Sequence, residues 1–90
     1  MSPNIIQLTG NLDNYLHGNP LHIRIGTYLK LEEGGEWLKI IRILGGSGVF
    51  CEYFGGNTRN IGITEDIFSR VVLPDDTEGL LGIIKERYNG

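Results

Sequence analysis

Residues 21–73 have the sequence LHIRIGTYLKLEEGGEWLKIIRILGGSGVFCEYFGGNTRNIGITEDIFSRVVL. Short apolar runs alternate there with three glycine turns, at 34–35, at 45–48 and at 55–57. Strands that follow one another closely and are joined by glycine turns are typical of consecutive antiparallel hairpins. The stretch therefore predicts a mostly-β fold, either a small barrel or a sandwich.

The composition agrees with a small β domain. The chain has 90 residues, which predicts a single domain, and it contains twelve isoleucines and no alanine. β-Branched residues favour strands, whereas alanine is the strongest helix former. The formal net charge is −3. Because non-specific binding to nucleic acid depends on clustered Lys and Arg, this charge weighs against a nucleic-acid partner.

The central stretch predicts five strands. In 21–31 apolar and polar residues alternate, and Gly26 marks a bulge or a bend. In 36–44 the apolar residues share one side only if a bulge lies near Ile40–Ile41. The other three strands are expected at 49–54, 59–63 and 70–73. The inward-facing residues are expected to include Ile23, Ile25, Leu29, Leu38, Ile40, Ile41, Ile43, Val49, Cys51, Tyr53, Ile61 and Ile63.

Simpler elements are expected at both ends of this region. Residues 1–20 predict a short edge strand at 4–8 and then a loop, which Tyr15, Leu16 and His17 attach to the strands. A helical turn is expected at 64–68. Pro74 ends the sheet, and a helix is expected over 75–88, with acidic residues in its first turn and basic ones in its last. Its apolar stripe consists of Leu80, Leu81, Ile84 and Tyr88.

From Gly35 to Pro74 the order and spacing of the expected elements resemble the Src-homology-3-like (SH3-like) small barrels, a class that includes Tudor domains. The likeness rests on a strand, a glycine turn, a strand that ends in Tyr53-Phe54-Gly55, a short strand, a helical turn and a last strand. The resemblance implies an antiparallel barrel of five or six strands that binds peptides, modified side chains or nucleic acid, or serves assembly. The sequence lacks the acidic loop and paired prolines of peptide-binding members, so no functional residue is carried over.

Aromatic and basic side chains are expected on the outside of the barrel, as in many binding surfaces. The alternative is that the N-terminal strand, the C-terminal helix or a second copy covers the aromatics, because small domains rarely expose so much apolar area. With Arg24 and Arg59, part of this set also resembles a platform for single-stranded nucleic acid. The candidate binding residues are Tyr28, Trp37, Lys39, Arg42, Phe50 and Phe54.

Catalytic and metal-binding patterns are weak in this sequence. Cys51 with His17 or His22 is the only thiol–histidine combination, and a cysteine within an apolar strand is more often a packing residue. No ligand spacing typical of a metal site occurs, and no cofactor is expected. No apolar run is long enough to span a membrane, and no signal peptide is evident, which predicts a cytoplasmic protein.

These patterns favour a non-catalytic module for binding or assembly. The first hypothesis is a homodimer formed through the aromatic face or through the helix stripe. The alternatives are a monomeric adaptor for a protein or a small ligand, a binder of single-stranded nucleic acid, and, with least support, a thiol enzyme that uses Cys51.

Overall fold

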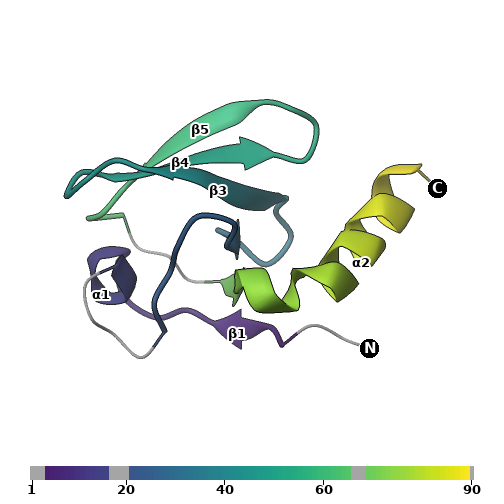
Figure 1. The fold of residues 1–90 in the computed structure, drawn as a ribbon, viewed down its shortest axis with the longest axis horizontal. Coiled ribbons are helices and arrows are strands. Elements are labelled where there is room, and N and C mark those ends of the chain that lie inside the picture. The colour runs from purple at the N-terminus through teal and green to yellow at the C-terminus, as the bar shows by residue number, and fades with distance from the viewer. Residues whose placement is uncertain (1–3, 17–20, 66–68, 90) are drawn as a thin grey trace.

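The structure, a computed structural model, describes residues 4–16, 21–65 and 69–89, and for 87–89 it describes the backbone alone. These residues form an antiparallel sheet of six strands and a C-terminal helix (Figure 1). The prediction of a mostly-β domain with a C-terminal helix is confirmed. The expected helical turn at 64–68 falls partly outside the described residues.

Apart from β2, which is much shorter than expected, the strands and the C-terminal helix lie close to where the sequence predicts them, and the predicted glycine turns join the strands from β2 to β5. In chain order they are β1 (Ile6–Gln7), α1 (Asp13–Leu16), β2 (Tyr28–Lys30), β3 (Trp37–Ile43), β4 (Gly48–Tyr53), β5 (Thr58–Gly62), β6 (Arg70–Val72), a 3-10 turn η1 (Pro74–Asp76) and α2 (Thr77–Asn89).

The strands are arranged in the order β1–β6–β2–β3–β4–β5, and every neighbouring pair is antiparallel. β1 and β5 form the two edges of the sheet. Within the described part of the chain these edges are not paired with each other, so the hydrogen-bonded ladder is open. The expected closure into a barrel is not made by this ladder, and the barrel stays a prediction.

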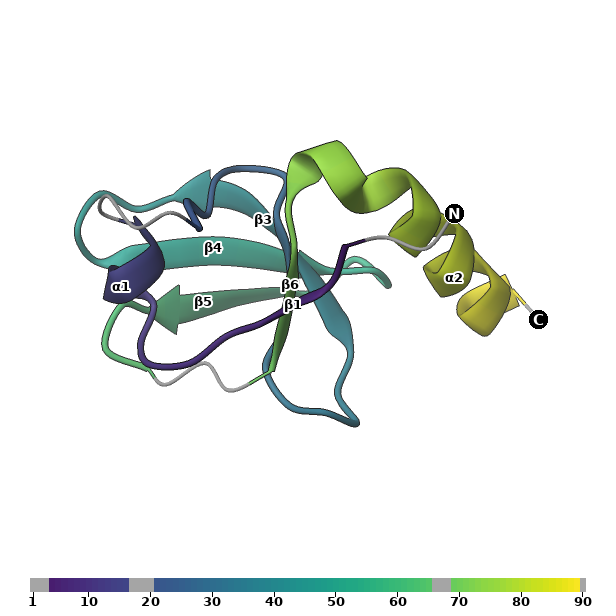
Figure 2. The same cartoon turned by 90° about the horizontal axis from the view of Figure 1, so that it is seen from below.

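The N-terminal segment connects the two ends of the sheet. The Leu8 N–H donates to the Ser69 carbonyl beside β6 (2.8 Å), and the Asp13 N–H donates to the Ile63 carbonyl after β5 (3.3 Å). Figure 2 shows this segment running from β1 to α1. The expected loop thus contains a helical turn. Tyr15 and Leu16 are buried and attach it as predicted, whereas His17 lies outside the described residues.

The predicted bulge in β3 is confirmed. The register between β3 and β4 shifts between Ile40 and Arg42, and Leu38 and Ile40 are buried. Ile43 pairs with Val49 and so lies on the expected inner side, but at the end of the strand it is 38% exposed and not buried. The last bond between β3 and the segment before β2 joins the Gly26 N–H to the Ile40 carbonyl (2.8 Å). Beyond that point β4 is the only strand among the described residues that pairs with the end of β3.

The expected strand over 21–31 is wrong in its first half. Only Tyr28–Lys30 form β2. Before it lies a tight turn in which the Thr27 N–H donates to the Arg24 carbonyl (3.0 Å), and Gly26 adopts a positive φ of 95°. A turn of this type favours glycine because other residues are strained there. The turn directs Ile25 into solvent, where it is 59% exposed, although Ile23 is buried as predicted.

Two apolar clusters lie on opposite faces of the sheet. We call the face covered by the N-terminal segment the inner face and the face covered by α2 the outer face. The outer cluster consists of Tyr28, Trp37, Val72, Leu80 and Ile84, with Phe54 and Leu81 at its margin. The inner cluster consists of Leu8, Leu12, Tyr15, Leu16, Ile23, Leu29, Leu38, Ile40, Val49, Cys51, Ile61 and Val71.

The C-terminal helix begins close to the predicted position. Pro74 follows β6, and Asp75 receives a bond from the Arg24 guanidinium (2.9 Å), which joins η1 to the turn before β2. α2 then runs from Thr77 to Asn89. Figures 1 and 2 show that α2 begins against the sheet and that its C-terminal end extends beyond the sheet.

Candidate binding surface

The outer face is made by alternate residues of each strand. Tyr28 lies opposite Lys39, Lys39 opposite Glu52, and Glu52 opposite Thr58, which gives one row of side chains across four strands. Since successive side chains of a strand point to opposite faces, these residues share a face. A second row consists of Arg42, Phe50 and Asn60.

One half of the outer face is covered by α2. Tyr28 and Trp37 are buried there, in contact with a cluster to which the helix contributes Leu80 and Ile84. Their assignment to the outer face is confirmed, but their expected exposure is wrong, and the alternative in which the C-terminal helix covers them holds. The Lys30 ammonium lies 5.4 Å from the centre of the Trp37 ring, within the range of a cation–π contact.

The helix stripe is therefore used within the chain. Leu80 and Ile84 are buried against the sheet, and Leu81 is half-buried. The side chain of Tyr88, the fourth residue of the predicted stripe, lies outside the described part of the structure. A dimer formed through this stripe would require α2 to leave the sheet.

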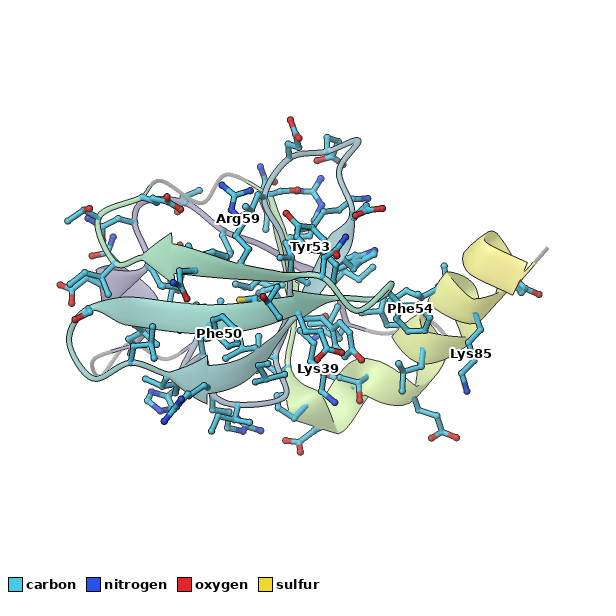
Figure 3. All side chains as sticks on the ribbon, turned by 90° about the horizontal axis from the view of Figure 1, so that it is seen from above. Lys39, Phe50, Tyr53, Phe54, Arg59 and Lys85 are labelled. Atoms are coloured by element: carbon cyan, nitrogen blue, oxygen red, sulfur yellow. The ribbon has the colours of Figure 1, made fainter. Side chains whose placement is uncertain are left out.

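The other half of the outer face is open. We call this surface the open outer face and define it as Lys39, Arg42, Phe50, Glu52, Thr58 and Asn60. Phe50 is half-buried and the other five side chains are exposed. Figure 3 shows Phe50 and Lys39 on β4 and β3, with Phe54 and Lys85 farther along toward α2.

Phe54 marks the border between the covered and the open half. It is half-buried, packs against the outer cluster and follows directly after β4. Three of the predicted binding residues, Lys39, Arg42 and Phe50, thus lie together on the open outer face. Glu52, Thr58 and Asn60 are not among the binding residues predicted from the sequence, although the alternation along β4 and β5 was a signal for them.

The electrostatic character of the open outer face is mildly basic. Lys39 and Arg42 contribute two cations, and Glu52 contributes one carboxylate directly opposite Lys39. Burial raises the pKa of the Tyr28 hydroxyl, and the Glu52 carboxylate raises it further, because a neighbouring negative charge disfavours the phenolate. The Glu52 carboxylate of the open half therefore acts on the Tyr28 hydroxyl of the covered half.

Two other cations of the suggested nucleic-acid platform lie elsewhere. Arg59 pairs with Cys51 and therefore projects on the inner side of the sheet, where a hydrogen bond with Tyr53 raises the pKa of its guanidinium. Arg24 is bound to Asp75. The structure thus does not gather Arg24 and Arg59 with Phe50.

A shallow pocket lies beside Arg59, with a volume of about 40 Å³. It is lined by the loop between β2 and β3 together with Leu38, Tyr53 and Arg59. A water molecule needs roughly 10–15 Å³ by the same measure, so this pocket holds about three waters and is far smaller than an ordinary ligand site.

The Cys51 thiol is enclosed in the inner cluster. Its side chain is fully buried, and burial raises its pKa to about 12, although Arg59 lowers it in part. A nucleophilic cysteine needs a thiolate and access to substrate. Cys51 has the properties of a packing residue.

Nowhere in 4–16, 21–65 or 69–89 do three His, Cys, Asp or Glu side chains lie close enough together to hold a metal ion. None of the helices in these ranges has the length and apolar character needed to cross a bilayer. Comparisons with models of known protein families, with curated proteins and with solved structures found no match to this chain.

Proposed function

We propose that this chain is a non-catalytic binding module that holds a protein segment on its open outer face. The observation that carries the proposal is the position of Phe50 between Arg42 and Asn60, on the one part of the outer face that α2 leaves uncovered. Aromatic side chains, including Phe, and arginine are enriched in protein interfaces relative to the rest of the surface.

The side chains of the open outer face indicate which kinds of side chain the bound segment has. Lys39 and Arg42 favour a partner with acidic side chains, and the half-buried Phe50 ring favours an apolar anchor beside them. Thr58 and Asn60 add polar groups at the rim. Because these residues belong to strands, their backbone positions are already ordered before binding, which lowers the entropic cost of recognition.

A display selection tests the proposal. Random peptides are selected on the wild-type domain alone, and the enriched peptides are then measured on the variants. We expect enriched peptides that contain acidic and apolar residues and that lose at least about tenfold in affinity, or about 1.4 kcal/mol, on Arg42→Glu and on Phe50→Ala. Circular dichroism shows whether each variant is folded.

Arg59→Glu is the matched control. It makes the same change of charge in the same sheet, but on the inner side. Peptides that bind this control as well as the wild type, and the Arg42→Glu variant less well, support the proposed surface. Equal losses on both variants would indicate a response to net charge and would contradict it. Binding of single-stranded oligonucleotide at Phe50 in place of peptide would move the function to the nucleic-acid alternative.

We also propose that the sheet and the N-terminal segment together make an incomplete SH3-like barrel. Two backbone bonds support this, from Leu8 to Ser69 at one edge of the sheet and from Asp13 to Ile63 beyond the other. The β3 bulge supports it too, because bulges bend strands as barrel closure requires. A cytoplasmic location stays a prediction.

A further inference from the structure

The edge strand β5 presents a free backbone. It has five residues, whereas the opposite edge strand β1 has two. Thr58, Arg59 and Asn60 are exposed, and a Cβ placed on Gly62 would have no heavy atom within 4 Å apart from those of adjacent residues. Figure 1 shows β5 at the margin of the sheet. No strand within the described residues pairs with the outer side of β5.

The hydrogen bonds at both ends of the hairpin decide which backbone groups of β5 are free. The Tyr53 N–H donates to the Asn57 carbonyl (2.7 Å), and the Ile63 N–H donates to the Ser47 carbonyl (3.2 Å). In an antiparallel pair the bonded residues alternate, so odd-numbered residues of β5 face β4 and even-numbered ones face outward. The Gly62 carbonyl already accepts from the Glu65 N–H (3.1 Å).

We propose that β5 pairs with β5 of a second copy of this chain, antiparallel about a twofold axis at Asn60. In this register the N–H and C=O of Asn60 exchange two bonds with the partner's Asn60. Each Gly62 N–H donates to the Thr58 carbonyl of the other copy. All four bonds use outward-facing groups that have no backbone hydrogen bond to any described residue of the same chain.

The side chains select this register over its neighbours. About Asn60, the Arg59 guanidinium lies opposite the partner's Ile61, and no two like charges are directly opposite. A twofold axis at Arg59 would place two guanidinium groups opposite each other. An axis at Ile61 would require the Gly62 carbonyl, which is already engaged. The register about Asn60 is therefore favoured over both of its neighbours.

The paired copies would join their open outer faces into one surface. Phe50 lies opposite Asn60 on the adjacent strand, so three strand spacings of about 4.8 Å separate the two Phe50 positions, roughly 14 Å in all. A longer acidic segment could then contact both. The pairing does not require the proposed peptide binding, and either can fail without the other.

Sedimentation of the whole chain over a wide concentration range tests the pairing. Because few groups are buried, we expect a weak dimer whose mean mass rises toward twice the monomer mass at high concentration. Asn60→Asp and Asn60→Lys should each remain monomeric, since each places like charges at the axis. An equimolar mixture of the two should regain the dimer, because the charges are then opposite. Asn60→Ser is the neutral control and should dimerise like the wild type.

Amide exchange of the wild type provides a second readout that does not depend on any variant folding. At high concentration the Asn60 and Gly62 amides should become protected, whereas the outward Thr58 amide should remain fast. A mass that stays monomeric at every concentration would overturn the pairing. So would a dimer that the Asp and Lys variants keep, or one whose concentration-dependent protection lies outside β5.

Discussion

Two adjacent isoleucines of α2 make a matched test of how the helix is held. Ile84 is 1% exposed and belongs to the outer cluster with Trp37, whereas Ile83 is 50% exposed. Truncating a buried isoleucine to alanine costs about 2–5 kcal/mol. Alanine returns about 0.4 kcal/mol through its higher helix propensity, which leaves a net loss of about 1.5–4.5 kcal/mol for Ile84→Ala.

The same change at Ile83 removes only about half as much buried apolar area as it does at Ile84, because Ile83 is half exposed. Full burial of an isoleucine contributes about 1.5–3 kcal/mol, so half of it contributes about 0.75–1.5 kcal/mol, of which the gain in propensity offsets about 0.4 kcal/mol. We expect a loss of about 0.4–1 kcal/mol for Ile83→Ala. In a domain of this size 1 kcal/mol corresponds to about 4–8 °C, so the Tm should fall by at least about 6 °C for Ile84→Ala and by about 2–8 °C for Ile83→Ala, with the smaller fall for Ile83→Ala.

Thermal and urea unfolding, followed in parallel by circular dichroism and by tryptophan fluorescence, measures these differences. Trp37 is the single tryptophan and is buried under α2, so its emission reports on the contact between helix and sheet. Ile84→Ala should shift this emission to the red before the sheet unfolds, if α2 leaves as a unit. Equal losses for the two substitutions, or an unchanged emission in Ile84→Ala, would refute the placement of α2 on the sheet.

Two further substitutions probe local features of the fold. Gly26→Ala should destabilise the domain by about 1–3 kcal/mol, because φ is 95° at this residue and the new Cβ would lie 3.3 Å from the Pro74 Cγ. The control is Gly34→Ala, whose Cβ would enter open space and which should be nearly neutral in the same urea titration. Cys51 should resist alkylation in the folded state. Burial raises the pKa of the Cys51 thiol from 9.0 to about 12, so between these pH values the folded state keeps a proton that the unfolded state releases. The free energy of unfolding should therefore fall as the pH rises from 9.0 to about 12, and it should fall less in Cys51→Ala. Rapid labelling of the native thiol, or identical pH profiles of the two proteins, would contradict this.

Local patterns predicted the central hairpins well. The alternation along 49–54 placed Val49 and Cys51 inward and Glu52 outward, as the structure has them, and the double isoleucine of β3 indicated the bulge. These features depend on the period of two in a strand and on turn chemistry, which involve neighbouring residues alone. The same reasoning placed Lys39, Arg42 and Phe50 together on one face.

The same alternation failed where a turn competed with a strand. Ile25 fits a strand period, yet the turn at Arg24–Thr27 takes it into solvent. This turn contains Gly26 in a left-handed conformation. Pro74, which is far away in the chain, lies beside that glycine. Turn chemistry therefore decided against the hydrophobic period at this position.

By itself the sequence determined the hairpin order, the bulge and the faces of the strand residues in the central hairpins, because these follow from local periodicity and from turns. The tertiary structure alone decided which half of the outer face is covered. Both faces of the sheet carry apolar side chains, so the pattern cannot say where α2 lies. That choice depends on the free energy of docking Leu80 and Ile84 onto Tyr28 and Trp37, which leaves Phe50 open beside them.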